Sequence, residues 1–196
     1  RYRGSVLGPF WLTLSTAVML AALGFLYAKL FRIDPTDYLP WLSVSLIVWN
    51  VLSAMVTDAT TSLTSAEGVI RQMPLPYSVH AMRVVIRNAL MAAHNLPLIL
   101  VVFFIFDVPF TWMALLAIPG FLLLAIVGFA ASILLGMLCA RFRDIPPIVG
   151  SLMQVAFFVS AVIWKPEMVG HWEPFLPLNP VFAVMEAVRA PIMGKT

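Results

Sequence analysis

Five long apolar stretches, separated by short segments that carry the charged residues, dominate the chain. Stretches without Asp, Glu, Lys or Arg cover residues 4–28, 38–57, 88–106, 108–140 and 145–164. A helix rises about 1.5 Å per residue and the core of a bilayer is about 30 Å thick, so each stretch is long enough to cross a membrane as a helix. The pattern predicts an all-α integral membrane protein with five transmembrane helices.

The fourth apolar stretch is longer than a single span requires. As one helix, residues 108–140 would measure about 50 Å. Pro109, Trp112 and Pro119 indicate an interfacial segment on the outer side, which leaves residues 119–140 to cross. Small residues recur at every fourth position of this span and predict close approach by another helix: Gly128, Ser132, Gly136 and Ala140.

A shorter apolar stretch, residues 174–185, lies near the C-terminus. It is too short to span a membrane and too apolar for an ordinary loop, so we expect an interfacial or re-entrant helix on the outer side. Asn179 is a candidate N-cap, with Pro180 at the first helical position. Glu186 and Arg189 are spaced to form an i,i+3 pair, and Pro191 is expected to end the helix.

Composition excludes a soluble globule. The 196 residues are 62% hydrophobic and only 11% charged, and their mean hydropathy is +0.98. A soluble domain of this size needs more polar surface than that. The net charge of +3 is too small and too dispersed to indicate nucleic-acid binding.

The positive charges are divided unequally between the two sides of the predicted bundle. If Arg1 and Arg3 are cytoplasmic, the outer segments between spans hold Lys29, Arg32 and Lys165. The inner segments hold Arg71, Arg83, Arg87, Arg141 and Arg143. The positive-inside rule therefore predicts a cytoplasmic N-terminus. Because five spans place the C-terminus outside, and because the chain starts within a basic segment, we expect a fragment that lacks an N-terminal piece and a sixth span.

Catalytic motifs are absent from the sequence. His80, His94 and His171 do not have the spacing of a metalloprotease helix, and neither a nucleophile elbow nor paired intramembrane carboxylates occur. The single cysteine, Cys139, excludes a cysteine-based metal cluster. The terminal Met-Gly-Lys-Thr lacks the first glycine of a phosphate-binding loop. We therefore expect no enzyme and no cofactor in this chain, and any ATP-driven work must use a partner.

Polar residues inside the second and fifth apolar stretches are candidates for a transport path. In the second, residues recur at three- or four-residue steps beside Asp58: Asn50, Ser53, Thr57, Thr61 and Thr64. Such a stripe fits a water-filled path. The alternative is that the hydroxyls bond back to the preceding turn or to a neighbouring helix, and that Asp58 onward already lies in the cytoplasmic interface. In the fifth, polar groups alternate with rings: Ser151, Gln154, Phe157, Phe158, Ser160 and Trp164. Rings that stack on the C–H faces of sugars suit a glycan, although ordinary helix packing is an alternative.

The segment between the second and third spans has the character of a docking surface. Ile70, Met73 and Leu75 are apolar residues that a solvated loop does not need, and they flank Arg71 and Pro74. They favour contact with a soluble partner, with a plain interfacial helix as the alternative.

Six stretches resemble a known family in their order and spacing. They are RYRGSVLGPFW at the start, LIVWNVLSAMV in the second span, VIRQMPLP after it, RFRDI, SAVIWKPEM and LNPVFAVMEAVRAPI. They are similar to the permease subunits of type-2 ABC exporters, most of all to those that export O-antigen, capsule and other polysaccharides.

This resemblance implies a subunit with six spans and an N-terminal interface helix, of which residues 1–196 form a single, truncated domain. It implies a homodimer that binds two ATPase subunits, which carry the ATP and Mg²⁺. The coupling helix would hold Ile70, Arg71, Met73 and Pro74, and the second inner turn would hold Arg141, Arg143 and Asp144. The outer re-entrant helix would hold Asn179, Pro180, Glu186 and Arg189.

The chain departs from the family pattern in two places. Ser160 is followed by Ala161 where the family often has Ser-Pro, so the resemblance does not predict whether the fifth span breaks there. Gln72 and Met73 replace a common Lys and β-branched residue, which indicates a different ATPase partner.

We expect the membrane subunit of a bacterial inner-membrane exporter of lipid-linked polysaccharide, with the second and fifth spans lining the path. The alternative is the same architecture exporting a drug, a lipid or another small amphiphile. A secondary transporter or channel is less favoured because intramembrane charges and inverted repeats are not evident. A membrane enzyme acting on lipid-linked sugars would have only the isolated Asp58 and Asp107.

Overall fold

The protein is a bundle of helices. The computed structural model describes residues 10–73, 75–109 and 111–194, and no strand occurs among them. In chain order the elements are α1 (Phe10–Phe31), α2 (Pro35–Thr60), η1 (Thr64–Ala66), α3 (Glu67–Gln72), α4 (Tyr77–Ile105), η2 (Trp112–Leu116), α5 (Ala117–Arg141), α6 (Ile145–Val159), η3 (Pro166–Leu178) and α7 (Pro180–Ile192). The all-α architecture predicted from the apolar stretches is confirmed.

Among the residues that the structure describes, four segments are long and apolar enough to cross a membrane. They are Thr13–Phe31, Pro35–Thr60, Tyr77–Ile105 and Trp112–Arg141. The fifth apolar stretch forms α6, a helix of only 15 residues, which is followed by a turn. A multi-pass membrane protein is thus confirmed, but residues 145–164 are a short helix plus an irregular segment, not one continuous span.

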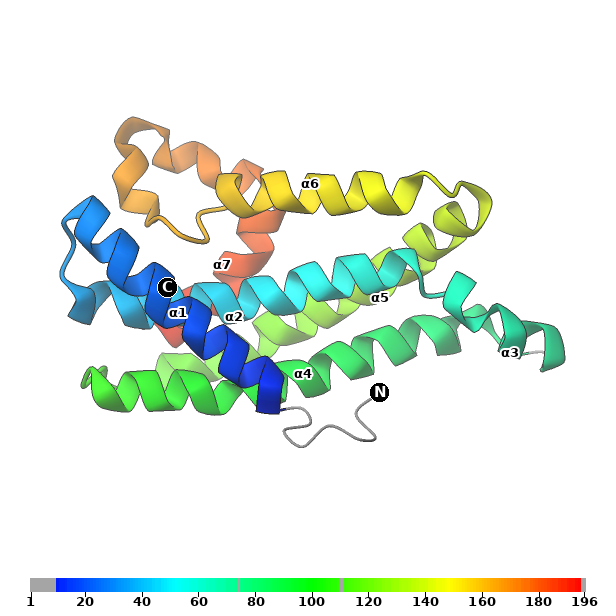
Figure 1. The fold of residues 1–196 in the computed structure, drawn as a ribbon, viewed down its shortest axis with the longest axis horizontal. Helices are drawn as coiled ribbons and strands as arrows, with labels where there is room; N and C mark the ends of the chain where they lie inside the picture. Colours follow the sequence, from blue (N-terminus) through cyan, green and yellow to red (C-terminus); the bar gives the residue numbers. More distant parts are fainter. Residues whose placement is uncertain (1–9, 74, 110, 195–196) are drawn as a thin grey trace.

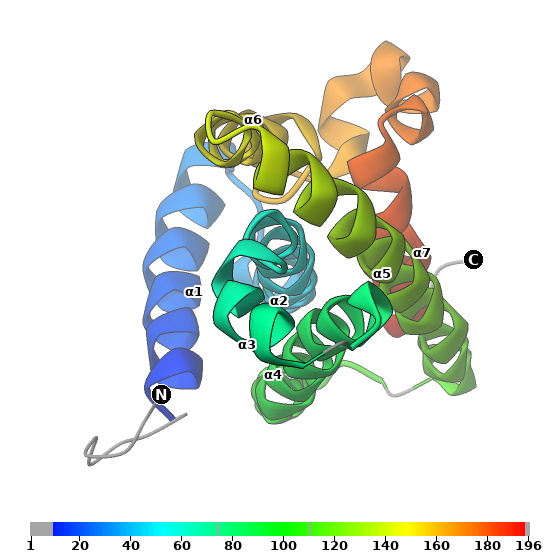
Figure 2. The ribbon, with the colours of Figure 1, turned by 90° about the vertical axis from the view of Figure 1, so that its right-hand side faces the viewer.

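Helix α2 forms the centre of the bundle. Figure 2 shows it enclosed by α1, α4, α5 and α6. Most of its side chains are buried, including Leu42, Leu46 and Met55. Asn50, Ser53 and Thr57 follow one face of α2, and polar side chains within a membrane bundle face its interior rather than lipid, which fits the place of α2 in the core.

The start of α2 is fixed by a capping residue. The Asp34 carboxylate accepts hydrogen bonds from the backbone N–H of Thr36 at 2.9 Å and from its hydroxyl at 2.7 Å, and Pro35 takes the first helical position. These two bonds stabilise the ionised form and hold the pKa of Asp34 below its ordinary value. The cap sets the direction in which α2 leaves the turn after α1.

The predicted stripe of small residues on α5 packs against α2. Gly128 faces Met55 and Gly136 faces Ser62 so closely that an added Cβ would overlap these side chains. Between them, the Ser62 hydroxyl donates to the Ser132 carbonyl at 3.0 Å. The close approach predicted by the stripe is confirmed for these three positions of α5, whereas Ala140 is exposed.

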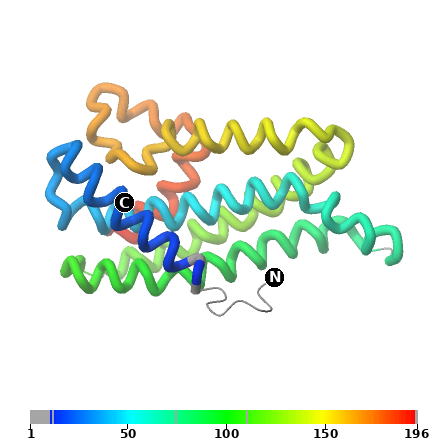
Figure 3. Tube along the Cα trace, in the orientation of Figure 1, coloured from blue at the N-terminus to red at the C-terminus, as the bar shows by residue number. Residues whose placement is uncertain are grey.

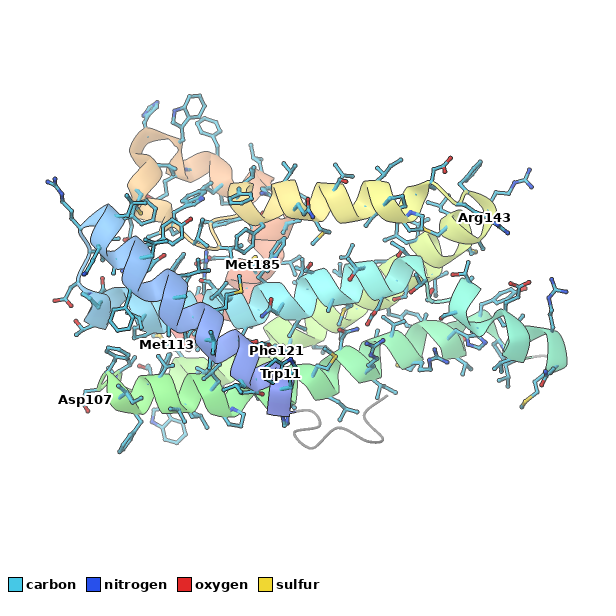
Figure 4. The ribbon with its side chains drawn as sticks, in the orientation of Figure 1. Trp11, Asp107, Met113, Phe121, Arg143 and Met185 are labelled. Carbon is cyan, nitrogen blue, oxygen red and sulfur yellow. The ribbon has the colours of Figure 1, made fainter. Side chains whose placement is uncertain are left out.

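Successive long helices run in alternating directions, so the bundle has two distinct ends (Figures 1 and 3). We call the end that carries α3 and the α5–α6 turn the α3 end. The opposite end carries the α1–α2 turn, the α4–α5 connection and η3, and we call it the α7 end. In Figure 4, Arg143 marks the α3 end and Asp107 marks the α7 end.

Helix α6 ends at Val159 although no proline follows Ser160. Ala161 adopts a left-handed conformation with φ of 51°, which costs an L-residue about 1 kcal/mol or more. A helix break is therefore present at Ser160–Ala161 without a proline. It is held by contacts with other elements.

Candidate functional site

A pocket of about 450 Å³ lies between α2 and α6 near the middle of the bundle. It contains six of the eight residues predicted to line a transport path. The residues that line it are Met19, Trp49, Asn50, Ser53, Thr57, Gly150, Met153, Gln154, Phe157 and Phe158.

Helical spacing brings these side chains onto facing surfaces. Asn50, Ser53 and Thr57 are separated by three and four residues and so share one face of α2. On α6, Gly150, Gln154 and Phe157 follow the same spacing. The two surfaces meet where the rings of Trp49 and Phe157 pack edge to face, with centroids 5.5 Å apart.

Two of the predicted path residues lie outside the pocket. Ser151 is on another face of α6, where its hydroxyl donates to the Pro147 carbonyl at 3.1 Å. Trp164 lies beyond the end of α6 and its indole N–H donates to the Phe158 carbonyl at 2.7 Å. Trp164 thus supports the backbone of the pocket wall without lining the pocket.

The polar side chains of α2 and of the pocket differ in whether they are free to bind a solute. The Thr57 hydroxyl donates to the Ser53 carbonyl at 2.8 Å, and the Thr61 hydroxyl donates to the Asp58 carbonyl at 3.3 Å. These hydroxyls bond back to their own helix, as one of the two interpretations of the stripe required. Within the described residues, the amides of Asn50 and Gln154 have no hydrogen bond to the protein, so they are available to a solute.

The two acidic residues that a membrane enzyme would have, Asp58 and Asp107, lie far apart in the fold. Asp58 lies toward the α3 end, where it pairs with Arg87 at 3.3 Å and accepts from the Asn88 amide at 3.1 Å. Asp107 lies at the α7 end (Figure 4). They do not form the paired acids that hydrolysis of a glycosidic bond uses.

Helix α3 presents its side chains away from the bundle. None of its residues is buried, and Met73, which follows it, is 52% exposed. Arg71 pairs with Glu67 one turn earlier, at 2.7 Å, and Ile70 is half-buried. Pro74 lies outside the described residues. The predicted coupling residues Ile70, Arg71 and Met73 therefore lie together on an exposed surface.

The second predicted coupling segment, the turn between α5 and α6, lies at the same end of the molecule as α3 (Figure 1). Arg141, Arg143 and Asp144 are all exposed. Asp144 precedes α6, but its side chain makes no capping hydrogen bond. Its carboxylate is left facing solvent.

Helix α7 has the start that the sequence predicts. The Asn179 side chain accepts from the backbone N–H groups of Val181 and Phe182 at 3.0 and 3.4 Å, and Pro180 is the first helical residue. Glu186 and Arg189 form the predicted ion pair. The helix continues through Pro191 and ends at Ile192, one residue later than expected, because proline lacks a donor but does not prevent the final turn from closing.

Sequence reasoning did not identify four residues of the pocket. Trp49, Gly150 and Met153 are near the predicted positions on α2 and α6, and a search four residues back from Gln154 and from Phe157 finds Gly150 and Met153. Met19 comes from α1, and no sequence signal shows which face of α1 meets this seam. Its contribution follows from the packing of α1 beside α2.

Comparison with known proteins agrees with this architecture. A family model described as "ABC-2 type transporter" matches residues 1–193. The chain is similar to the O-antigen export system permease protein RfbA of Myxococcus xanthus, with 24% identity over 193 residues, which cover 97% of this chain and 74% of that protein.

In this family the membrane protein is the transmembrane subunit, and ATP hydrolysis lies in a separate nucleotide-binding subunit. The present chain is therefore a permease without its own ATPase site. Because the family match extends over nearly the whole chain and the fold supplies four candidate spans, the chain belongs to the ABC-2 type transporter membrane proteins.

Proposed function

We propose that this chain is the transmembrane subunit of an exporter that moves lipid-linked polysaccharide across the bacterial inner membrane. The α2–α6 pocket is the observation that carries the proposal, because amide groups and aromatic rings meet there within an otherwise apolar bundle. The similarity to a permease named for O-antigen export supports a glycan as the substrate class.

The chemistry of the pocket suits a segment of a sugar chain. The amides of Asn50 and Gln154 each offer donors and an acceptor to hydroxyl groups. The rings of Phe157 and Phe158 offer faces for the C–H surfaces of sugar rings. A volume of about 450 Å³ lies within the range typical of small-molecule sites, so the pocket would hold a short part of the polymer at a time.

The α3 end is proposed to face the cytoplasm. Arg71, Arg141 and Arg143 lie at this end, and Arg83 and Arg87 are in the first turns of α4 close to it. Lys29, Arg32 and Lys165 are at or near the α7 end. This distribution fits the positive-inside rule with the α3 end inside.

The nucleotide-binding subunits would contact the α3 end, and their ATP-driven movement would change the shape of the pocket. A conformational change requires a ligand that distinguishes two states, and ATP bound between the partner subunits meets that requirement. Exposed Val69 and Met73 beside Arg71 give the nucleotide-binding subunit an apolar surface with a charged rim. Two copies of the chain and two nucleotide-binding subunits would form the assembly.

Purification and gene deletion together test this proposal. The full-length protein, extracted from native membranes in mild detergent, should bring an ATPase with it. Deletion of the gene should remove surface polysaccharide and leave lipid-linked chains inside the cell. Normal surface glycan in the deletion strain would contradict the polysaccharide assignment and favour a smaller amphiphile as substrate, whereas recovery of no ATPase would contradict the exporter itself.

A further inference from the structure

Helix α6 carries half of the pocket but is weakly held along its length. Met153 is its one buried residue among the 15 of the helix. It packs mainly on α2, with a small contact to α5. A helix with so little buried surface is positioned chiefly by what holds its two ends.

At the α7 end of the bundle, α6 is followed by a fully buried turn. Ser160, Ala161 and Val162 have no exposed surface, and Ala161 has a left-handed backbone. Carbonyl groups of an irregular turn have no partner within a helix, and in an apolar surrounding each must find one elsewhere. The residues that supply these partners therefore determine where the turn after α6 lies.

Arg189 of α7 supplies the central partner. Its Nη1 donates to the Ala161 carbonyl at 2.7 Å and to the Ser45 hydroxyl of α2 at 3.0 Å. Its Nε donates to Glu186 at 2.9 Å. The guanidinium also lies over the ring of Trp41 at 4.8 Å. With only 1% of its surface exposed, this one side chain joins α2, α7 and the turn after α6.

Neighbouring contacts hold the same turn but reach fewer elements. The Asn179 amide donates to the Ser160 hydroxyl at 3.0 Å, and the Tyr38 hydroxyl donates to the Ile163 carbonyl at 2.5 Å. Each of these bonds joins the turn to one other helix. Among the described residues, Arg189 is the one whose side chain joins the turn to both α7 and α2.

We propose that Arg189 is a positioning residue for transport, which sets the place of α6 against α2 and so fixes the wall that carries Gln154, Phe157 and Phe158. This rests on the proposed function, in which the α2–α6 pocket is the path. A glutamine at position 189 can neither form an ion pair with Glu186 nor reach both oxygens, so the turn would lose its joint attachment to α2 and α7 and open locally, while the rest of the bundle stays packed.

Thiol labelling of the full-length transporter with its ATPase tests the position of the turn without using any substrate. In a Cys139→Ser background, Val162→Cys places a reporter in the buried turn and Val155→Cys places one on the exposed face of α6. N-ethylmaleimide should react slowly with the first reporter, and Arg189→Gln should accelerate this reaction about tenfold because the turn opens locally. The second reporter should react equally fast in both.

Two matched variants complete the test. Arg87→Gln removes an arginine that pairs with Asp58 toward the α3 end, and it should leave both labelling rates unchanged. Arg189→Lys keeps the charge beside Glu186 without the planar fork, so its labelling rate should be intermediate. In Arg189→Gln, ATP hydrolysis should continue while export falls about tenfold, as expected when a binding wall is misplaced.

Unchanged labelling at Val162→Cys in both Arg189 variants would overturn the proposal. So would failure of both to assemble with the ATPase, since Arg189 would then serve folding of the whole bundle. Failure of the glycan assignment has a different result, because the labelling rates do not depend on what is transported.

Discussion

Single residues of the α2–α6 pocket divide into those that offer free polar groups and those that do not. Thr57 bonds to its own helix, whereas Asn50 and Gln154 direct their amides to the pocket. Under the proposed function, a hydrogen bond to the solute exchanges water for a sugar hydroxyl, and each amide would contribute about 0.5–1.5 kcal/mol. Recognition would then rest on these amides, and shape on the aromatic rings.

Replacing Gln154 by alanine tests this assignment. Loss of one hydrogen bond of that strength should lower export about three- to tenfold at limiting substrate, while ATPase activity and the amount of protein are retained. Ser151→Ala is the matched control on the same helix, since Ser151 lies outside the pocket. Export assays in cells that make the full-length variants would measure the effect, and an equal loss in both variants would argue against a specific role for Gln154.

Gly128 tests how closely α5 and α2 pack. Because a Cβ at this position would overlap Met55, Gly128→Val should destabilise the protein by about 1–3 kcal/mol through overpacking. The double variant with Met55→Ala should recover part of the loss. Thermal unfolding in detergent measures it, with Gly150→Ala as the control at a helical glycine that has open space around it. A Tm for Gly128→Val equal to that of the control would contradict the packing.

At the scale of elements, local chemistry predicted α7 better than α6. Asn179 followed by Pro180 specifies a helix start through bonds that involve only neighbouring residues, and the structure has it. The turn after α6 is bonded by Arg189 and Tyr38, which are distant in sequence and were not linked to it by any local pattern. Likewise, the spacing of Asn50 and Gln154 predicted pocket residues within a helix, whereas the Met19 contribution required the packing of α1.

Helix α3 is the element whose exposed surface should contact the nucleotide-binding subunit. Met73→Glu places a charge at the centre of the proposed contact, so recovery of the ATPase with the permease should fall about tenfold, as for loss of an interface anchor. The variant should fold normally because Met73 is largely exposed. Leu178→Glu, at an exposed residue before α7, is the control. Co-purification measures this recovery. Retention of the ATPase by Met73→Glu would place the contact elsewhere.

The whole molecule is a bundle whose two ends differ in charge and in structure. The α3 end carries most of the arginines in the described part of the chain and short exposed turns, whereas the α7 end carries Asp107 and Glu173 and a helix with a buried arginine. This asymmetry matches what an exporter requires, because energy enters on one side of the membrane and substrate leaves on the other.

Orientation can be measured directly with thiol reagents that do not cross membranes. In a Cys139→Ser background, Arg143→Cys should be labelled from the cytoplasmic side only. Asp107→Cys should be labelled from the opposite side only, because the two positions mark opposite ends of the bundle. Labelling of Arg143→Cys from outside in intact cells would reverse the proposed orientation.

The central claim is that a glycan passes through the α2–α6 pocket, and site-specific photocrosslinking tests it most directly. A photoreactive phenylalanine analogue would replace Gln154 or, as the control, Ser151 in the full-length protein within glycan-producing cells. Irradiation should yield a covalent adduct that contains the lipid-linked polysaccharide at position 154 and little at position 151. No glycan adduct at position 154, or equal amounts at the two positions, would contradict the account.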